Sequence, residues 1–474
     1  MDTSTANTGP SCLDAAGVLF DLGPVVTLPG DEPGAPAGSR PRLRRAARDQ
    51  IVMRNVALDE LLSEDHRARV VWQYVEGLDL TSLYQKILAV EGGKGRTPAD
   101  PRILLALWLY ATVEGVGSAR GLARLCEEHV AYQWLAGDVP MNYHTLADFR
   151  TGHAELLDGL LTKSVATLME QDLVDLNRVA QDGMRVRASA GASSFRRRPS
   201  LERCLQQAKE QVARLRAEVE ADPARGHAQQ HQAQARAASE RAERIQRALE
   251  RLPELEAKKK PAEKNQARAS TTDPDATVMK MPDGGFRPAF NVQFATDTPS
   301  KVIVGVDVIT SGSDAGQMPP MVQQIEERHE QVPNDMLVDG GFAKHEDIET
   351  VSKPAEMGAT AATDATGMTG TKGTTVYAPV PKSRNSEIDE HAPHRRDTPV
   401  ITEWRQRMAT PEAQAIYKER AATAELANAQ ARNRGLWQFR VRGLVKVRTM
   451  ALWYALAHNL MRAVALRAAA VAKG

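Results

Sequence analysis

This chain of 474 residues has few cysteines and almost no net charge. Its three cysteines, Cys12, Cys126 and Cys204, lie far apart and form no CxxC pair. This spacing argues against a zinc ribbon or a disulfide framework and favours a reducing compartment. Lysine and arginine number 61 against 60 acidic residues, so the net charge of +1 does not by itself indicate a nucleic-acid partner.

Long apolar runs are missing as well. The apolar-rich segment 450–471 is interrupted by His458, Asn459, Arg462 and Arg467, which predicts a buried amphipathic helix rather than a membrane span. The apolar stretch at 15–20 is too short for a signal peptide and lacks a basic start. We therefore expect a cytoplasmic protein with no membrane partner.

Positive charge gathers near the two ends of the chain. Residues 431–474 contain nine lysines and arginines and no acidic residue, which predicts a basic surface. Residues 1–48 are rich in Gly, Pro, Ala and Ser and lead into a run of arginines, which predicts a disordered basic tail. Such a tail either lies along phosphates or only keeps the protein in solution.

Residues 49–170 have a helical pattern and are predicted to form an N-terminal DNA-binding or dimerisation domain. Pro101 suits the start of one helix, and Ser118 can cap another that continues to about Gly137. Thr145, followed by Asp148 three residues later, is the expected cap of the next helix. Two short helices around a turn are compatible with a helix-turn-helix, although most such pairs bind no DNA. Candidate phosphate contacts are Arg120, Arg124, His144 and Arg150.

Residues 200–262 carry two heptad seams on either side of a Pro/Gly turn, which predicts an antiparallel coiled-coil hairpin. The first seam runs from Leu201 to Val219 and the second from Ala238 to Leu252. We expect this hairpin to be an inserted arm for dimerisation or for gripping DNA.

The remaining chain, 171–474, alternates strand and helix patterns and predicts an α/β domain. Strands are expected near Met184–Ala188, on both sides of a turn at 283–285, over 301–309, 336–338 and 377–380, and a helix over 317–329. Residues 352–400 are predicted to be a loop-rich insertion.

Two aspartates lie at informative positions in these strands. Asp182 lies in the early strand, where aspartate is disfavoured, and Asp339 ends the short strand 336–338 before two glycines. An acid at the carboxyl end of a buried strand is a frequent active-site location in α/β sheets. An ordinary turn-forming aspartate remains the alternative at both positions.

A third acid, Glu425, belongs to a stretch that is predicted to be one helix, 416–434, ended by Gly435. Tyr417, Arg420, Glu425 and Arg432 border one surface of this helix, within an arc of roughly 140°. A solvated glutamate on a surface helix is the alternative interpretation. Three carboxylates are hard ligands suited to Mg²⁺, and two such ions about 3.5–4 Å apart can support phosphodiester chemistry.

Taken together, the motifs resemble a DDE transposase of a bacterial insertion sequence, from the branch with an RNase H-like catalytic domain. The resemblance rests on QDGMRVRASA, DPDATVMK, NVQFATD, LVDGGFAKHEDI and VRGLVKVRTMALWYALAHNL, with DPRILLALWLYATVEGVGSARGLARLC and HTLADFR before them. Tyr417, Arg420, Glu425 and Arg432 match a Tyr-Arg-Glu-Lys signature, with arginine in place of the final lysine. The likeness covers about residues 50–465.

This resemblance implies an RNase H-like mixed sheet flanked by helices, preceded by the all-helical domain and interrupted by the hairpin. It makes Asp182, Asp339 and Glu425 the catalytic ligands of Mg²⁺, with Mn²⁺ as a substitute. The implied function is cleavage of the terminal inverted repeats and strand transfer by a homodimer or larger assembly on double-stranded DNA, at the nucleoid. The expected DNA contacts are Tyr417, Arg420, Arg432, Arg185, Arg187, Arg440, Arg442 and Lys446.

Two other functions fit parts of the sequence. An inactive or domesticated copy would bind DNA without cleaving it. A coiled-coil scaffold would account for the seams at 200–262 but would leave Asp182 and Asp339 unexplained.

Overall fold

The computed structural model describes residues 55–89, 97–221, 228–353, 373–382 and 389–472. The chain divides into two units, Met1–Val56 and Ala57–Gly474, and the architecture below is that of the second. The predicted basic tail, residues 1–48, lies outside the described residues, as do large parts of the predicted insertion at 352–400.

The segment before the sheet is helical, as predicted. After a 3₁₀ turn at Leu58–Leu61 come α1 (Arg67–Glu76), α2 (Thr81–Tyr84), α3 (Pro101–Val113), α4 (Ala119–Glu128), α5 (Val130–Ala136), α6 (Tyr143–Gly152) and α7 (Ala154–Glu170). The Ser118 cap is confirmed, because its hydroxyl accepts a hydrogen bond from the Gly121 amide.

Three details of this helical segment correct the sequence interpretation. The helix that begins after Ser118 breaks at His129, whose extended backbone starts a new helix. Asn142, not Thr145, caps α6 by accepting from the His144 amide. Arg150 is buried, its guanidinium donates to the Gly117 carbonyl and lies over the Trp108 ring, and so it is not a surface phosphate contact.

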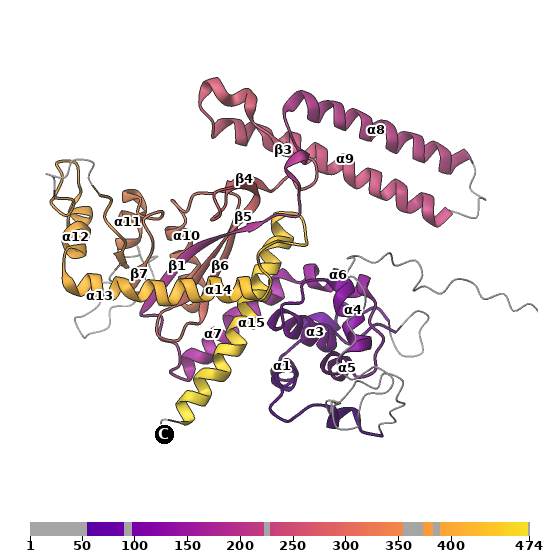
Figure 1. Ribbon diagram of the computed structural model, residues 1–474, viewed down its shortest axis with the longest axis horizontal. Coiled ribbons are helices and arrows are strands. Elements are labelled where there is room, and N and C mark those ends of the chain that lie inside the picture. Colours follow the sequence, from indigo (N-terminus) through magenta and orange to yellow (C-terminus); the bar gives the residue numbers. More distant parts are fainter. Residues whose placement is uncertain (1–54, 90–96, 222–227, 354–372, 383–388, 473–474) are drawn as a thin grey trace, which may run out of the picture. The chain divides into compact units, whose positions relative to one another are not determined.

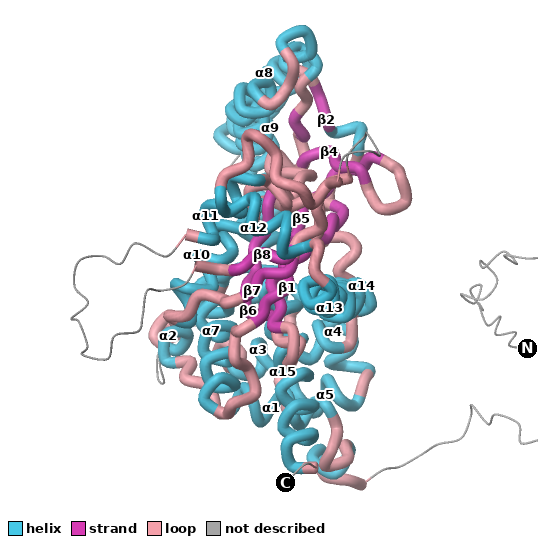
Figure 2. The backbone as a smooth tube through the Cα atoms, turned by 90° about the vertical axis from the view of Figure 1, so that its left-hand side faces the viewer, coloured by secondary structure: helices cyan, strands magenta, loops and turns pink. Residues whose placement is uncertain are grey.

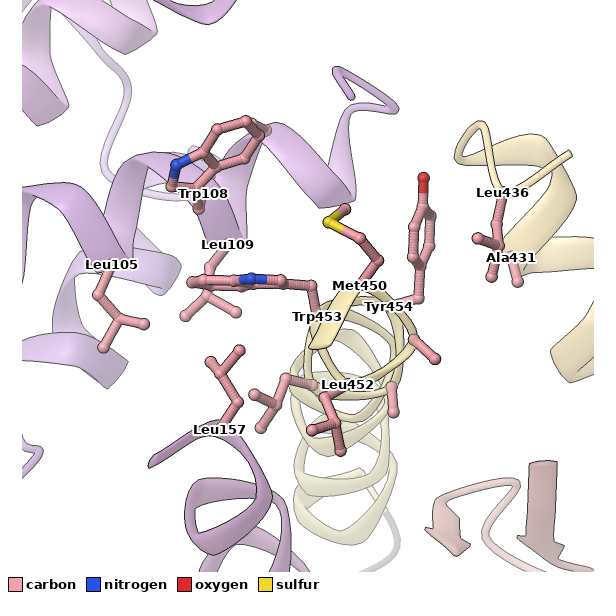
Figure 3. Close-up of a cluster of buried hydrophobic side chains, with 14 of the residues drawn as sticks. Leu105, Trp108, Leu109, Leu157, Ala431, Leu436, Met450, Leu452, Trp453 and Tyr454 are labelled. Atoms are coloured by element: carbon pink, nitrogen blue, oxygen red, sulfur yellow. The ribbon is translucent and has the colours of Figure 1, made fainter. Parts of the chain in front are cut away.

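Helix α15 (Leu444–Val471) is the central packing element of the helical segment. Figure 3 shows Trp453 and Met450 of α15 pointing toward Trp108 and Leu109 of α3. The Trp453 indole is fully buried and donates a hydrogen bond to the Arg150 carbonyl at 2.9 Å. The apolar run at 450–471 is therefore helical, as predicted, but it is buried only as far as Ala463, and residues 464–471 are mostly exposed. None of the helices described is long and apolar enough to span a membrane.

Replacement of Trp453 by alanine is expected to lower the free energy of unfolding by about 3–5 kcal/mol, because it opens a large cavity between α15 and α3. Urea denaturation followed by circular dichroism measures this change. Trp437→Ala is the matched control, since Trp437 is 53% exposed and should change stability by less than about 0.5 kcal/mol. Equal effects of the two substitutions would contradict the packing role of Trp453.

The chain forms one mixed six-stranded sheet in which β5 pairs with three other strands. The members are β1 (Arg178–Arg187), β4 (Thr277–Lys280), β5 (Phe286–Asp297), β6 (Ile303–Ile309), β7 (Asp335–Leu337) and β8 (Thr375–Tyr377). β4 and β6 both pair with β5, and the order continues β5-β1-β7-β8. Figure 2 shows the strands in magenta among the helices. β1, β7 and β8 are parallel, whereas β5 is antiparallel to its neighbours. The strand predicted at 377–380 lies earlier in the chain, at Thr375–Tyr377, and shares only Tyr377 with the prediction.

The predicted helical hairpin is confirmed. Figure 1 shows α8 (Arg198–Ala221) and α9 (Ala228–Ala257) side by side. They are antiparallel, since Arg198 at the start of α8 pairs with Glu256 at the end of α9 at 3.2 Å. Leu201 and Leu252, both from the predicted seams, are buried in the interface. A short two-stranded sheet of β2 (Phe195–Arg196) and β3 (Ala269–Ser270) closes the base of the hairpin.

The helices after the sheet strands are α10 (Met318–His329), α11 (His345–Ser352), α12 (Pro399–Met408), α13 (Pro411–Arg420) and α14 (Leu426–Asn433). The predicted single helix at 416–434 is continuous but not uniform. A π turn, Ala421–Glu425, separates α13 from α14, and Gly435 follows with φ of +92°. Such π turns are rare and often occur at functional sites.

Candidate active site

The register of the parallel strands brings two of the three predicted acids to the same level. Ala180 of β1 pairs with Leu337 of β7, so two residues further on Asp182, in the middle of β1, and Asp339, just after the end of β7, lie at the same level. Neighbouring strands lie about 4.8 Å apart. The side chains of Asp182 and Asp339 both approach Arg420, whose Nη2 lies 3.4 Å from Asp182 Oδ1 and 3.7 Å from Asp339 Oδ2.

Short local hydrogen bonds fix the orientation of both carboxylates. The Gly183 amide donates to Asp182 Oδ1 at 2.9 Å, and the Gly341 amide donates to Asp339 Oδ1 at 2.7 Å. The second oxygen of Asp182 accepts from Asn428 Nδ2 of α14 at 2.9 Å. Each carboxylate is therefore held by a backbone amide of its own segment. The second oxygen of Asp182 faces α14, and the second oxygen of Asp339 faces Arg420.

Burial and neighbouring charges both act on the Asp182 carboxyl. Burial raises the pKa of Asp182 above its usual value, and the nearby negative charges of Asp339 and Asp314 raise it further, while Arg420 opposes them. The Asp182 side chain is 18% exposed and that of Asp339 is 40% exposed. The second acid is thus the one more open to solvent.

Glu425, the third predicted acid, is not part of this contact. Its side chain is exposed and forms no hydrogen bond or ion pair within the described residues. The residue of α14 that faces Asp182 is Asn428, three positions later. In the part of the chain that the structure describes, no three acidic, histidine or cysteine side chains are close enough to enclose a metal ion.

The helix that carries Glu425 is nevertheless fastened to the sheet region. Arg178 at the start of β1 binds Glu419 at 2.8 Å, and Lys301 donates to the Thr423 hydroxyl at 2.7 Å. The π turn closes i→i+5 hydrogen bonds, so Arg420 and Glu425 lie one turn apart along this helix. Tyr417 lies close to the same charges: burial raises its pKa, and Asp339 and Asp182 add to the increase.

A fourth acid at this edge, Asp314, was missed from the sequence. Its Oδ1 accepts from Asn291 Nδ2 and Gln293 Nε2, both at 2.7 Å, on the buried strand β5. Asp314 follows β6 in a Ser/Gly-rich turn and matches no motif. Asn291 and Gln293 alternate with Phe290, Val292 and Phe294 on β5. This alternation was the feature of the sequence that indicated polar side chains on one face of the strand.

Gly183→Ala is expected to disturb this network strongly. An added Cβ would lie 2.1 Å from Asp314 Oδ1 and 2.6 Å from Gln293 Nε2, so the buried amides would have to move. We expect a stability loss of about 1–3 kcal/mol, measured by urea denaturation. Gly159→Ala is the control, because nothing lies within 4 Å of its added Cβ, and it should not destabilise the protein. Unchanged stability in Gly183→Ala would contradict the packing described here.

The predicted DNA contacts fall into three places. Tyr417 and Arg420 lie with the acids. Arg185, Arg187 and Arg432 line a groove of about 360 Å³ with Trp437 and the β4–β5 turn. Arg440, Arg442 and Lys446 line a second groove of about 600 Å³, together with Arg244 and Arg247 of the hairpin.

Comparison with protein families gives two matches. Residues 56–152 match the family described as Transposase domain (DUF772). Residues 384–464 match the family described as Transposase DDE domain. The two matched domains indicate a DDE-type transposase. Comparisons with curated proteins and with solved structures each gave no match.

Only some of the predicted site residues lie within the matched stretches. Tyr417, Arg420, Glu425 and Asn428 lie within the matched DDE domain. Asp182 and Asp339 lie outside both matched stretches, and their association with the DDE segment comes from the strand register and from Arg420.

Proposed function

We propose that the chain binds the terminal inverted repeats of an insertion sequence, cleaves one DNA strand there and joins the freed end to target DNA. The main support for the proposal is that the carboxylates of Asp182 and Asp339 lie at the same level of the sheet. They lie beside a helix within the segment that matches the Transposase DDE domain. The sheet order supports an RNase H-like domain, since antiparallel strands on one side of β1 are followed by parallel strands on the other.

The donor set at this edge suits a divalent cation. Aspartate oxygens are the ligands that Mg²⁺ and Mn²⁺ prefer, and Asn428 adds a buried amide oxygen, Oδ1, with no partner in the described residues. Asp182, Asp339 and Glu425 would hold the metal ions. When bound, such ions activate the attacking water or 3′-hydroxyl and neutralise the leaving oxygen.

The chain's own residues would orient the substrate around this centre. Asn428 keeps Asp182 from rotating by binding its Oδ2. Arg420 presents a guanidinium between the two acids, and once the acids are neutralised it can bind the scissile phosphate in a bidentate manner. Tyr417, one turn earlier on the same helix, borders the same surface.

The surrounding elements would hold the DNA duplex and a second copy. Residues 49–170 and the hairpin at 200–262 are the proposed regions for end binding and for assembly of a homodimer or larger complex. The basic side chains of the second groove, Arg440, Arg442 and Lys446, would contact phosphates of double-stranded DNA.

Strand cleavage on DNA that carries the inverted repeats flanking the gene tests the proposal. Purified protein should nick this DNA with Mg²⁺ or Mn²⁺ and not with excess EDTA, and a duplex of the same length without the repeats should stay intact. Binding of the repeats without nicking in either metal would favour the alternative of a decayed copy. Absence of both binding and nicking would contradict the proposal.

A further inference from the structure

Trp437 is an exposed tryptophan that the fold does not use. Trp108, Trp404 and Trp453 are fully buried, and each donates its indole N–H to a backbone carbonyl. Trp437 is 53% exposed, and its indole N–H has no hydrogen-bond partner in the described part of the chain. Packing therefore gives no reason for a tryptophan at this position.

The backbone that carries Trp437 is nevertheless firmly held. The Arg187 amide donates to the Trp437 carbonyl at 3.1 Å, and the Phe439 amide donates to the Arg187 carbonyl at 2.8 Å. Leu436 and Phe439 on either side are buried in the main core. The indole is thus a fixed aromatic surface at the end of β1.

Positive charge surrounds this surface. Trp437 lines the groove of about 360 Å³ with Arg185, Arg187 and Arg432. Neither Arg187 nor Arg432 forms an ion pair within the described residues, whereas Arg287, which also lines the groove, is neutralised by Asp283 at 2.6 Å. The groove therefore offers an aromatic face beside guanidinium groups without carboxylate partners.

We propose that this groove binds an unpaired nucleotide, whose base stacks on Trp437 while its phosphates contact Arg187 and Arg432. An exposed indole with adjacent arginines matches a nucleotide, which presents an aromatic face and an anion together. Paired bases in a duplex cannot present that face. This inference rests on the proposed function, because it names the form of DNA that the site takes.

The position of the groove fits DNA close to the cleavage site. Arg432 follows Glu425 by seven residues on the helix, a rise of about 10 Å. This distance equals roughly three steps along one DNA strand at about 3.4 Å each. The stacked base would then lie a few nucleotides from the bond that is cut.

Fluorescence anisotropy with two probes, the single strand dT12 and a mixed-sequence duplex of the same length, tests the inference. Trp437→Ala should weaken dT12 binding about tenfold or more and change duplex binding by less than about twofold. Trp437→Phe, which keeps an aromatic face, should retain most of the dT12 affinity. Arg432→Gln should weaken both probes and reduce the salt dependence by about one unit of slope.

Leu88→Ala is the matched control, since Leu88 is an exposed apolar side chain outside the groove and its loss should affect neither probe. Unchanged dT12 binding by Trp437→Ala would overturn the inference, and metal-dependent nicking by the wild type would show that the proposed function survives. A loss of self-association in Trp437→Ala, with normal dT12 binding, would instead assign this surface to a second copy. A wild type that binds neither probe and does not nick would remove both proposals.

Discussion

Asp182→Asn and Asp339→Asn are each expected to lower the rate of metal-dependent strand cleavage about a thousandfold or more, while binding to the inverted repeats persists. The amide keeps the size of the side chain but removes the charge that would hold a divalent cation. A loss of this size corresponds to about 4 kcal/mol of transition-state stabilisation, which is within the range of metal catalysis. Nicking assays and anisotropy on the same DNA measure the two properties.

Asp335→Asn is the matched control for this pair. Asp335 begins β7, four residues before Asp339, and binds Arg178 at 3.1 Å. It should cleave within about twofold of the wild type, because Asp335 lies four residues from Asp339 and Arg178 keeps its second partner, Glu419. Full cleavage by either Asp182→Asn or Asp339→Asn would refute the proposed metal ligands.

The third ligand needs its own comparison, because Glu425 is exposed while Asp314 lies beside Asp182. We expect Glu425→Gln to abolish cleavage, which requires its side chain to turn toward the acids when cations bind. Asp314→Asn should act mainly through the amides of β5. Normal cleavage by Glu425→Gln together with loss in Asp314→Asn would transfer the ligand role to Asp314.

Periodicity and capping rules were sufficient for much of the fold. The heptad seams predicted the α8–α9 hairpin, the β-branched run at 301–309 predicted β6, and the short apolar run at 336–338 predicted β7, because these patterns are local. As predicted, Asp182 lies within a strand, β1, and Asp339 lies just after the end of another, β7. Their alignment was not predictable in the same way, since it depends on pairing between segments far apart in sequence.

The misses have physical causes of the same kind. A π turn shifts a helical face by one residue, and a period of 3.6 cannot detect it before coordinates are known. Asn142 and Thr145 are both acceptable caps, and the chain geometry before α6 selects Asn142. Asn428 and Asp314 have side chains of ordinary surface type, and only tertiary packing brings them beside Asp182.

Arg420→Gln is expected to change metal binding and strand cleavage in opposite directions, whereas the Asp182 and Asp339 variants should lower both. The guanidinium lies within 4 Å of both Asp182 and Asp339 and so repels any cation that approaches them. Its loss should tighten Mn²⁺ binding to the DNA-free protein about fivefold, corresponding to roughly 1 kcal/mol for a partly exposed pair. Cleavage should still fall about a hundredfold, because the phosphate loses a charged donor in the transition state.

Isothermal titration with MnCl₂ measures the first effect without relying on catalysis, and the nicking assay measures the second. Arg420→Lys is the control, because it keeps the positive charge but loses the planar fork. It should bind Mn²⁺ like the wild type and still cleave poorly. Weaker Mn²⁺ binding by Arg420→Gln would contradict this expectation. It would show that the guanidinium holds the two carboxylates together for the metal, because the acids would move apart once the guanidinium is removed.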